Sequence, residues 1–160
     1  MSQQDLRRLE SLGYVGGDGA TDDDILDPDP DSHDPKDRIE FHIAYNDVAS
    51  LIELKRFGEA EAILRSLIKQ QPDFARGHFK LGRIALMQQR FSAAIARLRQ
   101  GLEFDPNYSV AYNNLGIAYG AQGHYDQAIH HFREALRIQP DDGPTQANLE
   151  ATLRLKSQRP

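Results

Sequence analysis

A 34-residue period runs through the middle of the chain and constrains its fold more than any other feature. Three consecutive segments, residues 41–74, 75–108 and 109–142, align without a gap. An aromatic residue recurs at position 17 of each segment, an alanine at position 20 and a proline at position 32. Within each segment, apolar residues recur at i, i+3, i+4 and i+7, which predicts two amphipathic helices per unit.

The positions that separate the helices have simple physical roles. Small residues at positions 8, 20 and 27, such as Gly82, Ala94 and Gly101, predict that the two helices of a unit approach closely. The proline at position 32 lacks an N–H and disfavours helix in the residue before it, so it predicts the end of each second helix. Short turns between paired helices are expected at Lys55-Arg56, Gln89-Arg90 and Gly123-His124.

The charge of the chain is unevenly distributed. Residues 1–37 hold three Lys/Arg against eleven Asp/Glu, a net charge of −8, whereas residues 38–160 hold sixteen against thirteen, a net charge of +3. Nine Asp and three Pro fall within residues 18–37. Such a composition cannot bury enough apolar surface to fold alone, so residues 17–38 are predicted to form an acidic flexible linker. Residues 1–16, with Leu6, Leu9 and Leu12 on one side, predict a short amphipathic helix before it.

Motifs for catalysis and cofactor binding do not occur. There is no cysteine, no glycine-rich phosphate loop and no H-E-x-x-H zinc motif, so we expect neither an enzyme nor a cofactor or metal. The six histidines are expected to be solvated helix residues. The acidic start at Asp27 lacks the glycine and glutamate of a calcium loop, which favours a linker. Asn107 begins a formal glycosylation sequon.

Nucleic acid and membrane partners are not expected either. A charge of +3 on residues 38–160 is too weak for a nucleic-acid footprint, and no segment has the ~18–20 consecutive apolar residues that span a bilayer. The N-terminus shows no signal-peptide pattern, which by default favours the cytoplasm.

The repeated unit resembles the tetratricopeptide repeat (TPR), and the third unit resembles it most. The resemblance implies an all-α fold, a right-handed α-solenoid of three helix pairs over residues 39–158, closed by a capping helix over residues 143–158. Asp47 departs from the family, because a leucine is usual at position 7. In the capping helix, Leu149 and Leu153 are expected to share the face that shields the end of the array.

In this family the first helix of each unit lines a concave groove, which implies a peptide-binding site. Arg and Lys offer charge-assisted bonds to carboxylates, and Asn offers hydrogen bonds to an extended backbone. Arg83 and Asn114 fit the carboxylate clamp of chaperone-binding members, whereas Tyr45 and Ala49 replace its Lys and Asn. The groove residues implied by the resemblance are His42, Tyr45, Arg76, Phe79, Lys80, Arg83, Asn113, Asn114, Ile117 and Asn148.

The N-terminal segment has a second resemblance. The run LRRLESLGYVGG, the acidic linker and DPKDRIEF resemble the C-terminal end of bacterial sulfatase-like proteins that carry TPR appendages. This implies an accessory region of a hydrolase, exported to the periplasm or secreted, whose catalytic residues are absent from this chain.

Three functions follow as expectations. The first is non-enzymatic binding of a protein or peptide segment, such as an acidic one, in the groove. The second is self-assembly into a homo-oligomer, in which the acidic N-terminal arm docks on a neighbouring array. The third is the accessory role beside a sulfatase-like hydrolase.

Overall fold

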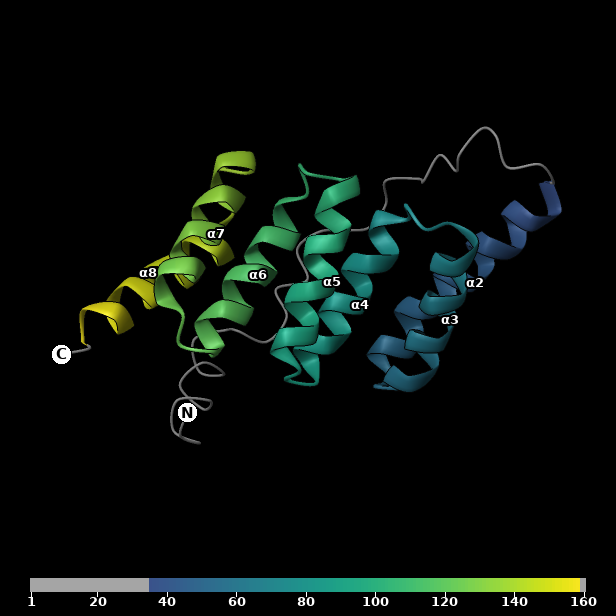
Figure 1. The fold of residues 1–160 in the computed structure, drawn as a ribbon, viewed down its shortest axis with the longest axis horizontal. Coiled ribbons are helices and arrows are strands. Elements are labelled where there is room, and N and C mark those ends of the chain that lie inside the picture. The colour runs from purple at the N-terminus through teal and green to yellow at the C-terminus, as the bar shows by residue number, and fades with distance from the viewer. Residues whose placement is uncertain (1–34, 159–160) are drawn as a thin grey trace. The chain divides into compact units, whose positions relative to one another are not determined.

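The computed structural model describes residues 35–158, with side chains from Phe41 onward, and these residues form seven α-helices and no strand (Figure 1). First helices begin at Ala75, Ser109 and Gly143, each 34 residues after the one before, so the predicted all-α repeat array is confirmed. The helices are α2 (Pro35–Glu53), α3 (Phe57–Gln70), α4 (Ala75–Met87), α5 (Phe91–Phe104), α6 (Ser109–Ala121), α7 (Tyr125–Ile138) and α8 (Gly143–Ser157).

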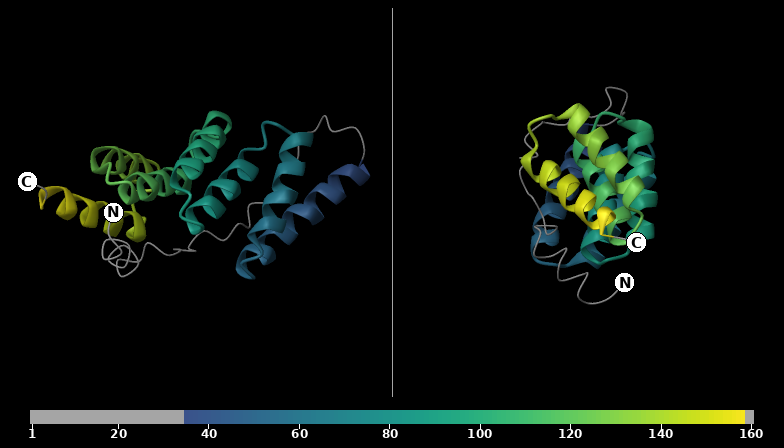
Figure 2. Two further views of the ribbon diagram at one scale, coloured as in Figure 1. Left: turned by 60° about the horizontal axis from the view of Figure 1, so that its bottom comes forward. Right: turned by 90° about the vertical axis from the view of Figure 1, so that its left-hand side faces the viewer.

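The helices divide into two compact units, α2–α3 and α4–α8. In the larger unit α6 contacts α4, α5, α7 and α8, and α8 packs at one end (Figures 1 and 2). Helix α2 begins at Pro35, inside the range predicted as linker, because proline is well suited to the first position of a helix. The predictions for residues 1–16 and 17–34 lie outside the described residues.

The turn within each repeat depends on one residue in the left-handed backbone region. Lys55, Gln89 and Gly123 have φ values of 56°, 58° and 77°. The amide of Gln89 donates to Leu86 O, and the amide of Arg90 donates to Ala85 O, both at 2.8 Å. These two bonds form a Schellman motif, which ends the first helix and starts the turn. The predicted turns are therefore confirmed.

The paired helices touch at the small residues. A Cβ atom placed on Gly101 would lie 2.3 Å from Cε1 of Phe79 and 3.1 Å from Ala75 O. A Cβ on Gly116 would lie 2.4 Å from Cε1 of Phe132. Ala94 and its counterparts in the other repeats are fully buried. The second helices end at Gln70, Phe104 and Ile138, two residues before each proline, as predicted.

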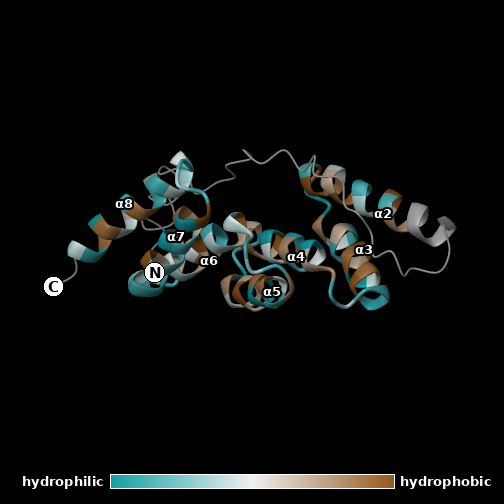
Figure 3. Cartoon of the chain, turned by 90° about the horizontal axis from the view of Figure 1, so that it is seen from above, coloured by the Kyte–Doolittle hydropathy of each residue, from teal (hydrophilic) through white to brown (hydrophobic). Residues whose placement is uncertain are grey.

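The core of the larger unit combines residues from both helices of each repeat. Every helix in this unit carries both hydrophobic and hydrophilic residues (Figure 3). Asp47 is exposed, whereas Leu81 and Leu115 at the same repeat position are buried, so its departure from the family pattern carries no burial penalty. The central cluster consists of Phe79, Leu98, Ala111, Leu115, Tyr119, Ala128 and Phe132.

Helix α8 packs against the central cluster through Leu149, as predicted, and also through polar groups, which the sequence did not predict. Leu153 is 40% exposed, whereas Thr145, Asn148 and Thr152 are buried. Their polar atoms are satisfied: the hydroxyl of Thr145 donates to Asp142 at 2.5 Å, and that of Thr152 donates to the carbonyl of Asn148 at 2.8 Å. Because these bonds remove the cost of burying polar groups, the capping face tolerates threonine and asparagine in place of leucine.

Across residues 35–158, no helix combines the length and apolar character that crossing a bilayer would require.

Replacing Gly101 with alanine should destabilise the protein by about 1–3 kcal/mol, because the new methyl group would overlap the Phe79 ring. Gly120→Ala is the matched control. Its Cβ would meet only the Ala128 Cβ at an ordinary 3.7 Å, so it should stabilise the helix by up to about 1 kcal/mol. Urea unfolding of both variants measures the difference. Equal stabilities would contradict the close approach of α4 and α5.

Replacing Gln89 with glycine should stabilise the protein by about 0.5–1 kcal/mol, because glycine adopts a positive φ without steric cost. The reverse exchange, Gly123→Gln, should lose a similar amount in the equivalent turn. The midpoints of thermal unfolding report both changes. If the two midpoints shifted in the same direction, the positive φ would not be the cause of the stability difference.

Candidate functional site

The candidate site lies on the side of α4 and α6 that carries the predicted groove residues. On α4, Arg76, Lys80 and Arg83 are spaced by four and three residues, so they share one side of the helix. On α6, Asn114 and Ile117 follow the same spacing. We call these five residues, together with Asn113, the first-helix face. All six are half-buried, so each keeps part of its side chain accessible.

The first-helix face is positively charged. Helix α4 contains no acidic residue, and α6 contains no charged residue at all. The three cations of α4 are therefore the only charged groups among the six residues of the first-helix face. Amide groups at Asn113 and Asn114 continue the polar surface beside them. Such a face suits a ligand with carboxylates and exposed peptide groups.

Two predicted groove residues are part of the packing. Phe79 is only 5% exposed, and its ring stacks on Tyr108 with 4.6 Å between centroids. Asn148 is also buried, and its Nδ2 donates to Oδ1 of Asn113 at 3.0 Å. Phe79 thus belongs to the helix interface above Gly101, and Asn148 anchors α8 to α6. Neither side chain is placed to contact a ligand.

The other two predicted residues lie on α2. His42 is half-buried, and Tyr45 is 8% exposed. Helix α2 belongs to the smaller unit, whereas the first-helix face belongs to the larger one.

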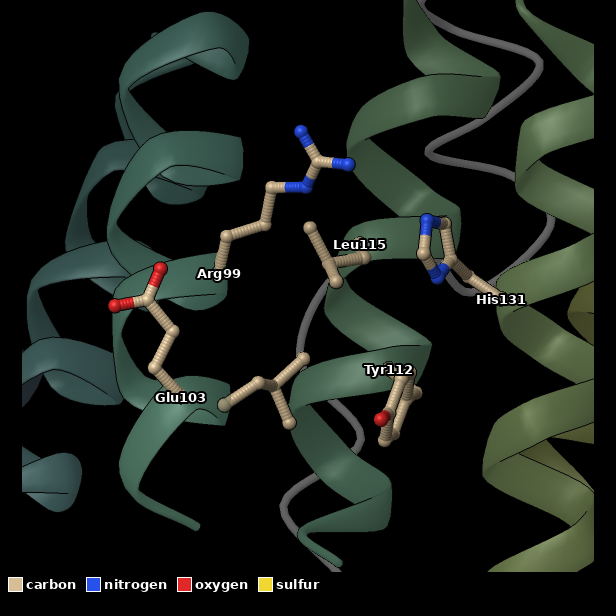
Figure 4. A pocket seen from close by; sticks show the side chains of 6 residues that line it. Arg99, Glu103, Tyr112, Leu115 and His131 are labelled. Carbon is tan, nitrogen blue, oxygen red and sulfur yellow. The ribbon is translucent and has the colours of Figure 1, made fainter. Parts of the chain in front are cut away.

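A second feature, an open hollow of about 450 Å³, lies between α5 and α7 (Figure 4). Figure 4 shows Arg99 and Glu103 on one wall, Tyr112 and Leu115 on α6 in the middle, and His131 of α7 on the other wall. Tyr112 and Leu115 are on the opposite side of α6 from Asn114 and Ile117, given 100° per residue. The hollow and the first-helix face therefore occupy opposite sides of one helix. Leu102 completes the lining.

His131, on one wall of the hollow, has a pKa that its surroundings shift. Its ring stacks on Tyr119 with 5.3 Å between centroids and lies 6.2 Å from Tyr112. Its Nδ1 is buried and makes no hydrogen bond. Burial lowers the pKa of His131 to about 4, and the positive charges of His130 and Arg99 add to this, while Glu134 opposes it. The imidazole is therefore neutral at pH 7.

Within residues 41–158, the expectation that the histidines are solvated is wrong for His78 and His131, whose Nδ1 atoms are both buried. His78 is 5% exposed and stacks on Phe104 at 5.9 Å, and His131 is half-buried. For His131, the signal in the sequence was its position, because it lies one residue before the core residue Phe132, next to the apolar side of α7. No group of His, Asp or Glu within residues 35–158 is arranged to hold a metal ion.

Comparison with known proteins places the repeats in a family. Tetratricopeptide repeat descriptions match residues 51–116 and 109–142, which together cover more than half of the chain. No curated protein matches the chain. None of these findings supports the sulfatase-like resemblance, which rests mainly on residues outside the described range.

Solved structures share the fold. The Arabidopsis OM64 TPR domain has a TM-score of 0.69 at 17% identity, covering 72% of this chain and 96% of that domain. The first TPR of Spaghetti (RPAP3), bound to the HSP90 peptide SRMEEVD, has a TM-score of 0.71 at 13% identity, covering 74% and 94%. MamA from Desulfovibrio magneticus RS-1 has a TM-score of 0.68 at 19% identity, covering 73% and 66%.

The buried His131 should make folding stability depend on pH. Its folded pKa of about 4 lies below the ordinary value of 6.5, so the unfolded chain binds a proton that the folded chain does not. The contribution of His131 to the free energy of unfolding is fully present above pH 6.5 and is lost as the pH drops toward 4. Because the ring is partly exposed, we expect the loss to be on the order of 1 kcal/mol.

The variant His131→Phe keeps an aromatic ring beside Tyr119 and should remove this part of the pH dependence. Urea unfolding at pH 7 and pH 4.5 gives the comparison with the parent protein, and His130→Gln is the control for its exposed neighbour. An unchanged slope in His131→Phe would show that other groups cause the acid sensitivity.

Proposed function

We propose that this chain, which belongs to the tetratricopeptide repeat family, is a non-catalytic module that binds an extended, acidic segment of a partner protein along its first-helix face. The observation that carries this proposal is the stripe of Arg76, Lys80 and Arg83 on α4, beside the uncharged, amide-bearing side of α6. Guanidinium and ammonium groups that keep part of their side chain accessible form charge-assisted hydrogen bonds with carboxylates.

The chemistry of the face supports a peptide rather than a small molecule. Guanidinium groups form paired hydrogen bonds with carboxylates, and side-chain amides both donate to and accept from a peptide backbone. Ile117 adds an apolar contact between them. The bond from Asn148 holds the Asn113 side chain in place, which lowers the entropy that binding would cost.

The fold likeness to the RPAP3 domain supports the general class of function, because that domain is bound to a peptide with acidic residues. At 13% identity it does not carry the partner over. Arg83 and Asn114 fit a carboxylate clamp, but Tyr45 is buried and Ala49 lacks an amide. We therefore propose an acidic segment other than a chaperone tail.

The acidic N-terminal arm is a second candidate ligand. Residues 18–37 hold nine Asp, which complement the cations of α4 in charge. If the arm of one copy docks on the face of another, the same residues would support self-assembly. Binding to a separate partner and binding to the arm would then compete for one surface.

Selection of peptides from a random display library on the full chain tests the proposal. We expect the selected peptides to be enriched in Asp and Glu, and their binding to weaken as salt rises, because charge pairs on a surface are screened. Enrichment of neutral or basic peptides, or the recovery of none, would contradict it.

Arg83→Glu should then weaken the selected peptides by roughly tenfold or more, because a carboxylate of the ligand would face a like charge. Arg133→Glu makes the same charge change at an exposed residue of α7, a helix that contributes no residue to the first-helix face, and should leave affinity nearly unchanged. Fluorescence anisotropy measures both affinities. Equal losses in the two variants would indicate a general charge effect instead of a site.

A further inference from the structure

The wall of the hollow formed by α5 carries two side chains of opposite charge that do not bond to each other. Arg99 and Glu103 are four residues apart, exposed, and on one side of the helix. Within residues 41–158 neither side chain forms an ion pair or a hydrogen bond. Other acid–base neighbours in the same unit, such as Glu134 and Arg137, do pair.

The order of the two residues does not favour a bond between them. A basic residue that precedes an acidic one by four positions is the weaker arrangement on a helix, since the helix dipole favours the reverse order. Figure 4 shows the guanidinium of Arg99 and the carboxylate of Glu103 turned away from each other. Each charge is therefore available to an external group.

The hollow beside this pair is apolar at its base. Leu102, Leu115 and the ring of Tyr112 line it, and the phenol of Tyr112 already donates to Pro106 O at 3.2 Å. A long side chain with an apolar stem and a cationic head would fit there. Its stem would cover the leucines and the ring of Tyr112, and its head would reach Glu103 at the rim of the hollow.

The chain itself supplies such a side chain. We propose that two copies associate about a two-fold axis beside α5, with Arg99 of each copy reaching into the hollow of the other to pair with Glu103. A two-fold interface must be self-complementary, so that residue i contacts j and j contacts i. Arg99 and Glu103 meet this condition, because each copy contributes the Arg99 cation to the other copy and offers its own Glu103 carboxylate in return.

This interface is independent of the first-helix face. The hollow lies on the opposite side of α6, so a dimer formed through it leaves Arg76, Lys80 and Arg83 accessible to a ligand. The contact is small, and we expect a weak dimer whose Kd is on the order of micromolar or higher. The charge pairs set the orientation, and burial of the leucines and Tyr112 supplies affinity.

Sedimentation equilibrium of the full chain tests the proposal. Over about two decades of protein concentration, the mass should rise from 18.1 kDa toward twice that value. Arg99→Glu places two like-charge contacts in the interface and should raise the Kd by roughly tenfold or more. Glu103→Arg should do the same.

The double variant R99E/E103R is the decisive test. Exchanging both charges places opposite charges across the two-fold axis again, so the dimer should be restored. Arg97→Glu is the control, since its side chain lies on another side of α5 and bonds to Gln100.

A parent chain that stays monomeric would overturn the proposal. So would single variants that dimerise normally, or a double variant that remains monomeric. Circular dichroism confirms that each variant is folded.

Assembly that grows beyond a dimer, survives Arg99→Glu and weakens with Arg83→Glu would also overturn it. That pattern would assign self-association to the acidic arm and the first-helix face.

Discussion

The close contact between the two helices of each repeat is the interaction on which the rest of the structure depends. In the second repeat, the Phe79 ring lies where a Cβ on Gly101 would be, and in the third, Phe132 does the same above Gly116. Because the helices approach so closely, a single helix pair has no room for a core of its own. Its apolar residues must be covered by the next repeat, which is how stacked repeats gain stability.

This dependence explains the composition of α6. It contacts four other helices, none of its side chains is exposed, and it carries no charge. A charged residue at most of its positions would be desolvated at a cost of several kcal/mol. The charges that surround it therefore come from its neighbours: Arg76, Lys80 and Arg83 of α4 on one side, and Arg99 and Glu103 of α5 on the other. The neutral helix thus separates two surfaces with different charge patterns.

The repeat period was sufficient to predict the architecture. Position 15 lies in a turn, position 32 ends a helix, and positions 8 and 27 lie at the contact between helices. Three aligned segments therefore determine the helix bounds except the start of α2 at Pro35, which precedes the first segment. The first-helix cations were named from the resemblance to the family, and their spacing of four and three residues places them on one side of α4. These features depend only on local geometry, which the sequence states directly.

The features that were missed depend on contacts between repeats. Phe79 was expected in the groove, but Tyr108 from the start of the next unit covers its ring. Leu149 and Leu153 were expected to shield the end of the array, but only Leu149 packs against the core. Asn148 and Thr152, whose polar groups are hydrogen-bonded, are buried while Leu153 is exposed. The hollow joins residues from α5, α6 and α7, none of which forms a pattern within one unit. A period shows what every repeat shares, whereas function on either side of α6 depends on what distinguishes one repeat from the next.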